Sequence, residues 1–147
     1  VPAGYEGLTI TDDTLVTKAW VNDNVVTVTD DLVLRSAIGN GATTTAIGTM
    51  PNAAGITYYV SKVSIYVSTA YSGGSIDHVT LTDGTTTWVA DADADITTAG
   101  TYVIDLPFAT ATAGAASFTL NYLQSNASAS TPTGGAGIVT VEYKAIS

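Results

Sequence analysis

Three aspartates at alternate positions, Asp91, Asp93 and Asp95, are the motif in this chain whose residue types and spacing suggest metal chemistry. Carboxylates at every second position resemble the start of a calcium-binding loop. Such a loop requires glycine at its sixth position and glutamate at its twelfth, where this chain has Ile96 and Tyr102. We therefore favour a solvated acidic turn, keep calcium binding as the alternative, and expect no metal or cofactor.

A single histidine, His78, is the other residue that could perform chemistry near neutral pH. Asp77 and Asp83 lie close to it in sequence and could orient it as a general base. The chain has no cysteine, and no serine stands in a Gly-x-Ser-x-Gly pattern that would supply a nucleophile. We predict that His78 lies on the exposed outer face of a hairpin.

Paired acids occur at Asp12-Asp13 and at Asp30-Asp31 and invite comparison with the two carboxylates of glycosidases. Adjacent residues of a strand point to opposite faces, so neither pair forms a catalytic couple, and we expect turn or cap roles. With one histidine, one arginine and three lysines, the chain offers few groups for proton transfer. Enzyme activity is therefore the class we expect least, and we assign no catalytic or cofactor-binding residue.

The formal net charge of −9 is spread along the chain, with six acids against two cations in residues 1–54 and seven against two in the remainder. An anionic surface repels phosphate backbones and anionic lipids. The charge predicts no nucleic-acid partner and no membrane partner. Apolar runs are too short to span a bilayer.

Short runs with alternating apolar residues, separated by glycine-rich turns at spacings of about ten residues, predict an all-β antiparallel sandwich or barrel. From residue 55 onward we expect six strands, with a possible seventh around residues 109–112. Residues 13–20 are the only candidate for a short helix. The predicted apolar faces are Val63, Ile65 and Val67; Tyr102, Ile104 and Leu106; Phe118, Leu120 and Tyr122; and Val139, Val141, Tyr143 and Ala145.

The clearest local signal is Asp83-Gly84 between two alternating runs, because Asp-Gly favours a two-residue type I′ hairpin. A two-residue loop places Val79 opposite Trp88 and Leu81 opposite Thr86 on a core face. The same register places His78 and Val89 on the surface face, although a one-residue bulge would reverse part of this assignment.

Two breaks divide the chain, at residues 52–55 and at residues 124–137, and we expect the second to be an exposed loop. Residues 55–147 are the predicted sandwich domain. Residues 1–54 form either additional strands or a docking arm that lies on a neighbouring molecule. We favour the arm slightly, because Tyr5 and Trp20 are its only aromatic residues.

Eight tyrosines could stack on sugars or anchor a protein interface wherever they are exposed. Tyr58 and Tyr59 are adjacent on one predicted strand, so they must face opposite sides of a sheet. We expect most of the tyrosines to be half-buried.

Residues 63–71, 90–102 and 137–143 (VSIYVSTAY, ADADADITTAGTY and GIVTVEY) resemble segments of small virion proteins of tailed bacteriophages. The resemblance covers roughly the final two-thirds of the chain and carries no catalytic residues. It implies a β-sandwich, jelly-roll-like, that decorates or cements a capsid, commonly as a trimer.

Our leading hypothesis is therefore a non-enzymatic virion structural protein, bound to the major capsid protein on the outer capsid surface and self-associating as a homotrimer. A carbohydrate- or receptor-binding module of a phage tail or secreted protein is the alternative. A tail-tube or connector component is a further alternative.

Overall fold

The structure, a computed structural model, describes residues 32–90, 92–106, 111–112 and 114–146. These residues form nine strands and no helix, and none of the described elements is a helix able to cross a membrane. The strands are β1 (Leu32–Ile38), β2 (Thr44–Thr49), β3 (Thr57–Ser72), β4 (His78–Thr82), β5 (Thr87–Val89), β6 (Gly100–Asp105), β7 (Ala111–Thr112), β8 (Ser117–Leu123) and β9 (Gly134–Ile146). The all-β prediction is confirmed. The candidate helix at residues 13–20 lies outside the described residues.

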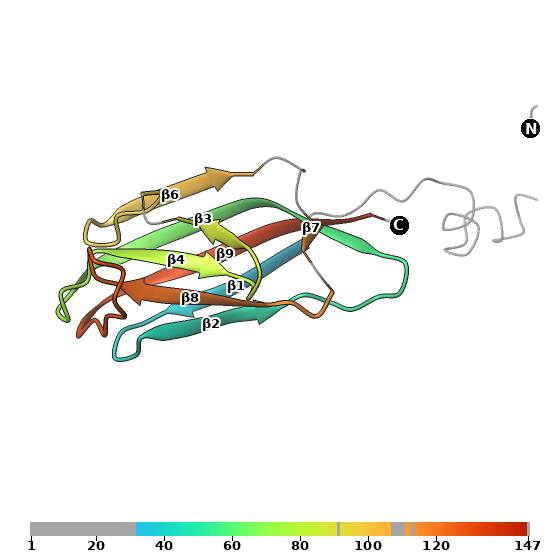
Figure 1. The fold of residues 1–147 in the computed structure, drawn as a ribbon. Coiled ribbons are helices and arrows are strands. Elements are labelled where there is room, and N and C mark those ends of the chain that lie inside the picture. The colour runs from blue at the N-terminus through green and yellow to red at the C-terminus, as the bar shows by residue number, and fades with distance from the viewer. Residues whose placement is uncertain (1–31, 91, 107–110, 113, 147) are drawn as a thin grey trace, which may run out of the picture. The chain divides into compact units, whose positions relative to one another are not determined.

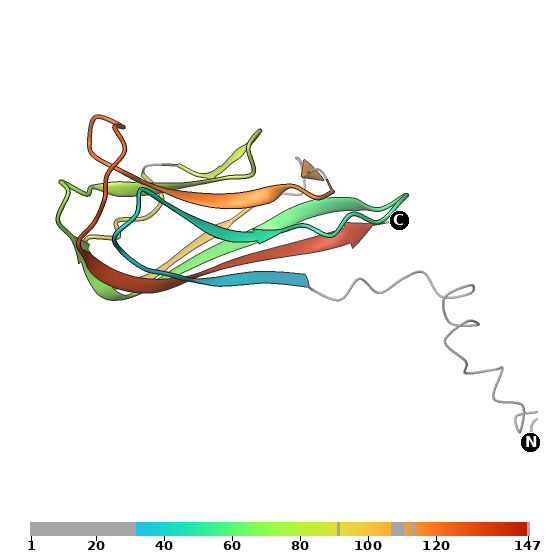
Figure 2. The ribbon, with the colours of Figure 1, turned by 90° about the horizontal axis from the view of Figure 1, so that it is seen from below.

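The strands form two antiparallel sheets that pack face to face, which confirms the predicted β-sandwich (Figures 1 and 2). Sheet A has the order β1-β9-β3-β6, with β7 also paired to β3, and sheet B has the order β2-β8-β4-β5. Strands that follow one another in the chain occupy equivalent places in the two sheets. β1 and β2 come first, β9 and β8 second, β3 and β4 third, and β6 and β5 fourth.

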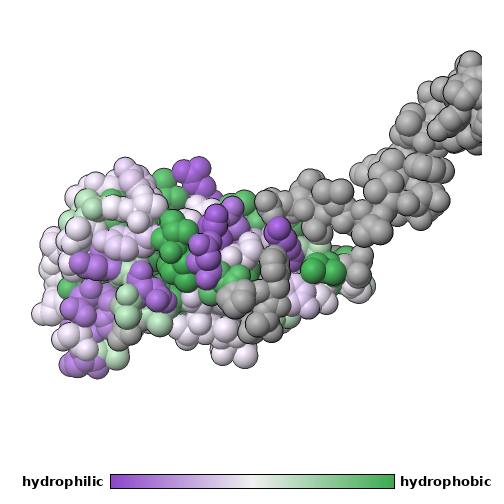
Figure 3. Space-filling view, turned by 90° about the horizontal axis from the view of Figure 1, so that it is seen from above, coloured by the Kyte–Doolittle hydropathy of each residue, from purple (hydrophilic) through white to green (hydrophobic). Residues whose placement is uncertain are grey.

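The inner faces of the two sheets supply the core, as the alternation of apolar residues predicted. Val63, Ile65 and Val67 of β3 are at most 1% exposed, and Phe118, Leu120 and Tyr122 of β8 are fully buried. The rings of Trp88 and Phe118 lie 6.5 Å apart, centroid to centroid. Burial of alternate side chains on both sheets provides most of the driving force for this fold. Tyr102 and Ile104 are only partly buried, because their strand, β6, lies at the edge of sheet A. The surface seen in Figure 3 carries hydrophobic side chains among hydrophilic ones.

The first two strands correct the boundary that we placed at residue 54. β1 pairs with β9 over seven residues, and β2 pairs with β8, so residues 32–49 are the additional strands of our first alternative and not the arm that we favoured slightly. The scarcity of aromatic residues in this segment did not decide its place, because residues of other strands contact it. The hydroxyl of Tyr71, for example, donates a 2.7 Å hydrogen bond to the Ile38 carbonyl oxygen. Residues 1–31 lie outside the described residues.

The hairpin at Asp83-Gly84 forms, but its register differs from our prediction. Thr82 pairs with Thr87 and Leu81 with Val89, so four residues form the loop and a bulge follows it. Gly84 has a φ of 91°. An Asp83 carboxylate oxygen accepts hydrogen bonds from the amides of Thr85 and Thr86, which stabilises the wider turn. Val89 is consequently buried, whereas the two-residue loop placed it on the surface.

The segment at residues 124–137 is only partly the exposed loop that we expected. Residues 134–137 belong to β9, and Ser130 is 1% exposed. The Ser130 amide donates a hydrogen bond to the Tyr122 carbonyl oxygen, and the Ser130 hydroxyl donates one to the Gly74 carbonyl oxygen. These bonds fold the loop back onto the sandwich and compensate for the polar atoms that it buries.

Gly135 is a position where a side chain should not fit. Its φ is 123°, and an added Cβ would lie 2.5 Å from the ring of Tyr71, which is itself buried and hydrogen-bonded. We expect Gly135→Ala to lower the free energy of unfolding in urea by about 2–3 kcal/mol. Gly100→Ala is the control, because nothing lies within 4 Å of its added Cβ, and should change stability by less than about 0.5 kcal/mol. Equal effects of the two substitutions would contradict this interpretation.

Candidate functional site

The acidic motif caps its own turn between β5 and β6. An Asp93 carboxylate oxygen accepts a hydrogen bond from the Ala90 amide, and Asp95 accepts from the amide and hydroxyl of Thr97. The hydrogen bonds from Thr97 and Thr98 lower the pKa of the Asp95 carboxyl despite a small opposing effect of burial. Asp91 lies outside the described residues, among which no three potential metal ligands gather.

His78 is 4% exposed, which corrects our prediction of a surface histidine. It lies at the start of β4 beside Leu123 of β8, which also pairs with Ala129. Its Nδ1 lies 3.1 Å from an Asp77 carboxylate oxygen. Asp83, the other proposed partner, instead accepts hydrogen bonds from Thr85, Thr86 and the hydroxyl of Thr112.

Asp83 makes the stability of the hairpin dependent on pH. Partial burial acts to raise its pKa, but the hydrogen bonds from Thr86, Thr85 and Thr112 outweigh it, so the pKa of Asp83 falls below its ordinary value of 3.8. A carboxyl with a lowered folded-state pKa contributes stability above its unfolded pKa and loses it as the pH falls through the folded pKa. We expect the loss of free energy of unfolding between pH 7 and pH 3, measured in urea, to be smaller in Asp83→Asn than in wild type. Equal losses at pH 3 in both proteins would contradict this.

The outer face of sheet A, meaning the side chains that point away from the core, is built from rungs that cross four strands. One rung contains Arg35 on β1, Thr140 on β9, Ser64 on β3 and Val103 on β6. The rung on one side contains Val33, Glu142, Lys62 and Asp105, and the rung on the other side contains Ala37, Ile138, Tyr66 and Thr101. Residues distant in the sequence therefore meet on one surface.

Exposed apolar side chains gather on this face. Within the described residues four large hydrophobic side chains are about half exposed, and each comes from a different strand of sheet A. They are Val33 at 49%, Tyr66 at 49%, Val103 at 54% and Ile146 at 48%. Register and alternation place all four on the outer side of the sheet. Large apolar side chains exposed on one face of a sheet are typical of interaction surfaces.

Positive charge gathers on the same face. Arg35, Lys62 and Lys144 are the arginine and lysine residues of the described part of the chain, and all three point outward from sheet A. Asp105 and Glu142 share the face with them. Three cations against two carboxylates leave it slightly positive, whereas the other described acids, Asp77, Asp83, Asp93 and Asp95, lie elsewhere without any lysine or arginine. The face thus differs in charge from the rest of the described surface.

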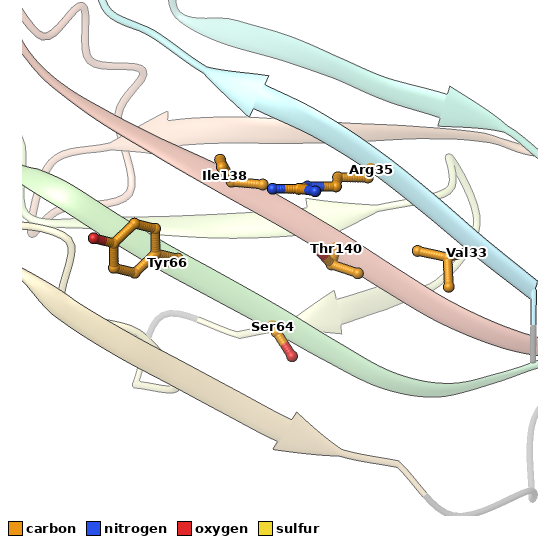
Figure 4. Close-up of a pocket in the computed structure, with 6 residues that line it drawn as sticks. All are labelled: Val33, Arg35, Ser64, Tyr66, Ile138 and Thr140. Carbon is orange, nitrogen blue, oxygen red and sulfur yellow. The ribbon is translucent and has the colours of Figure 1, made fainter.

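A shallow groove of about 430 Å³ crosses this face, lined by Val33, Arg35, Ser64, Tyr66, Ile138 and Thr140 (Figure 4). Its floor is low because Ser64 and Thr140, on the two central strands, carry short side chains between rungs with longer ones. Arg35 reaches from β1 across β9 toward Ile138, and the ring of Tyr66 is seen face-on in this view (Figure 4). The lining residues include no carboxylate and no histidine. Such a surface can hold a ligand through apolar contact, stacking and hydrogen bonds from the guanidinium.

Within the groove, Arg35 differs from the neighbouring lysine in having no partner among the described residues. Lys62 lies 3.8 Å from a Glu142 carboxylate oxygen, whereas no described residue forms a hydrogen bond or ion pair with the Arg35 guanidinium. Its donors therefore remain available to a ligand.

The alternation of Val63, Ile65 and Val67 in the core implies that Ser64 and Tyr66 point outward. Nothing in the sequence pattern connects them with Arg35 or Val103, so we did not predict this site. Tyr58 and Tyr59 do face opposite sides, since Tyr58 is 2% exposed and Tyr59 is half-buried. Four of the tyrosines, namely Tyr58, Tyr71, Tyr122 and Tyr143, are buried more deeply than we expected.

Comparisons of the chain with profiles of known protein families, with curated protein sequences and with solved structures found no match.

Proposed function

We propose that this chain is a non-enzymatic virion structural protein that decorates and stabilises the capsid of a tailed phage, with the outer face of sheet A as its docking surface. The major capsid protein is the proposed partner, and the outer capsid surface is the proposed location. The sandwich provides a rigid module, and one of its faces provides adhesion.

The observation that carries this proposal is the gathering of all four exposed large hydrophobic side chains and all three cations of the described residues on one sheet face. The opposite face, outside sheet B, instead presents small hydroxyl and amide side chains such as Thr80, Thr119 and Asn121. Aromatic residues and arginine are the residue types that contribute most to protein interfaces. The difference between the two faces favours sheet A as the side that meets a partner.

The strand order supports the jelly-roll part of the proposal. In both sheets, consecutive strands occupy equivalent positions, as expected when a long antiparallel hairpin is wound into two layers. Jelly rolls are frequent in viral capsid proteins and lectins, so this topology is compatible with the leading function and with its alternative. A homotrimer in solution, measured by light scattering, remains our expectation for the oligomeric state.

The direct test is binding of the purified full chain to capsids of the same virus that were assembled without it. We expect saturable binding at a fixed number of copies per capsomer, measured by co-sedimentation, and increased resistance of the capsids to heat. No binding to such capsids, together with binding to tails, would contradict the capsid proposal and favour a tail-tube or connector component.

A carbohydrate-binding module is the second candidate, because Tyr66 exposes an aromatic ring beside the hydroxyls of Ser64 and Thr140 in a groove of ligand size. Saturable binding on a glycan panel, lost in Tyr66→Ala and retained in Thr80→Ala, would favour this candidate. A panel without any binding would leave the capsid proposal as the better one.

A further inference from the structure

We infer that the outer face of sheet A recognises an acidic protein surface, in which a carboxylate binds Arg35 and flanking aliphatic side chains pack against Tyr66, Ile138 and Val33. This inference rests on the proposed function and adds the chemistry of the partner. It assigns Arg35 the role of anchor, although the docking proposal itself requires only an adhesive face.

Charge complementarity selects an acidic partner. The chain has a net charge of −9, so most of its surface repels an acidic protein. Among the described residues, the outer face of sheet A carries three cations against two carboxylates, and the acids outside it have no lysine or arginine beside them. An acidic partner is therefore attracted to the outer face of sheet A, while repulsion by the rest of the described surface disfavours binding in other orientations.

Arg35 is the cation best placed to meet the partner. Lys62 has Glu142 as a neighbour at 3.8 Å, whereas the Arg35 guanidinium has no hydrogen-bond or ion-pair partner among the described residues. A guanidinium can bind a carboxylate through two parallel hydrogen bonds, which adds geometric specificity. An unpaired arginine in an acidic protein is thus suited to an incoming carboxylate.

The groove also specifies what must surround that carboxylate. Arg35 lies over β9 toward Ile138, and Val33 and Tyr66 are each 49% exposed (Figure 4). Apolar contact at these side chains would exclude water from the ion pair and strengthen it. The partner should therefore present an acidic residue beside leucine, valine or similar side chains, and not an isolated charge cluster.

The test measures binding of full-length variants to capsids assembled without the protein. Arg35→Gln and Thr80→Glu change the net charge by the same amount, but only the first lies on the outer face of sheet A. We expect Arg35→Gln to weaken binding at least tenfold and Thr80→Glu to weaken it less than twofold. Arg35→Lys keeps the charge but loses the paired hydrogen bonds, so it should bind between wild type and Arg35→Gln. Circular dichroism of each variant verifies folding.

The partner's carboxylates are tested by amidating the capsid surface with a carbodiimide and an uncharged amine. We expect amidation to weaken wild-type binding and to abolish the difference between wild type and Arg35→Gln. If wild type and Arg35→Gln still differ in binding by the same factor after amidation, the inference is overturned. Displacement of the wild-type protein by soluble oligogalacturonate would also overturn it, because it would indicate an acidic saccharide as the ligand. If Arg35→Gln binds like wild type while Tyr66 and Val103 substitutions abolish binding, the inference fails and the proposed function stands. If wild-type protein does not bind capsids, the proposed function itself fails.

Discussion

Replacing Tyr66 and Val103 together by serine is expected to weaken binding to undecorated capsids at least tenfold while leaving the fold intact. Both side chains are about half exposed, so the substitutions remove apolar surface from the outer face of sheet A without opening a cavity in the core. Truncation of an aromatic interface residue commonly costs about 1–2 kcal/mol or more, which corresponds to roughly a tenfold change in affinity. The measurement is a binding isotherm by co-sedimentation.

A matched control for this double variant lies on the other face of the sandwich. Thr80 and Thr119 point outward from neighbouring strands of sheet B, so Thr80→Ser with Thr119→Ser also places serine at two outward strand positions. We expect this variant to bind like wild type. If both double variants bind equally well, the outer face of sheet A is not the docking surface.

Phe118→Ala is expected to produce the largest loss of stability among the predicted substitutions, about 3–5 kcal/mol in urea unfolding. Phe118 is fully buried on β8, a central strand of sheet B, and its ring lies 6.5 Å from that of Trp88. Removing the ring leaves a cavity, because β8 is hydrogen-bonded to β2 on one side and β4 on the other and cannot move to fill it.

Two variants keep this prediction testable if Phe118→Ala does not fold. Phe118→Leu preserves most of the volume and should lose about 1–1.5 kcal/mol. Thr119 follows Phe118 in β8 and points to the outer face, so Thr119→Ala should lower the free energy of unfolding by less than about 1 kcal/mol. A loss below 1 kcal/mol in Phe118→Ala would contradict the core position of this side chain.

Much of the sandwich could be predicted from the sequence, because alternation of apolar residues is a local property. The inner faces of β3, β8 and β9 follow directly from the alternation of residues such as Val63, Phe118 and Val141. β6 follows the same alternation with less burial because it lies at the edge of sheet A.

Features that depend on tertiary pairing were missed. The Asp83-Gly84 turn has four residues and not two, and the Asp83 carboxylate stabilises it by accepting hydrogen bonds from two amides. The longer turn changes the register of β5, so that Val89 is buried and not exposed. His78 is buried where β4 pairs with Leu123 of β8, more than forty residues later in the chain. The place of β1 and β2 depends on partners near the C-terminal end of the chain, so their own composition could not decide it.

The site could be predicted only in part. Alternation alone indicates that Tyr66 and Val103 point away from the core. It cannot bring them beside Arg35, because this requires the order β1-β9-β3-β6 and the register Arg35–Thr140–Ser64–Val103. The charge analysis found acids and cations spread along the chain, whereas the fold concentrates the described cations on one face.

Electron cryo-microscopy of capsids decorated with the full chain is the most direct test of whether this molecule acts by adhesion through the outer face of sheet A. We predict density for the sandwich on the outer capsid surface, with β1, β9, β3 and β6 toward the shell and with Tyr66, Val103 and Arg35 in contact with it. A sandwich bound with this face toward solvent, or capsids that carry no such density, would contradict the prediction.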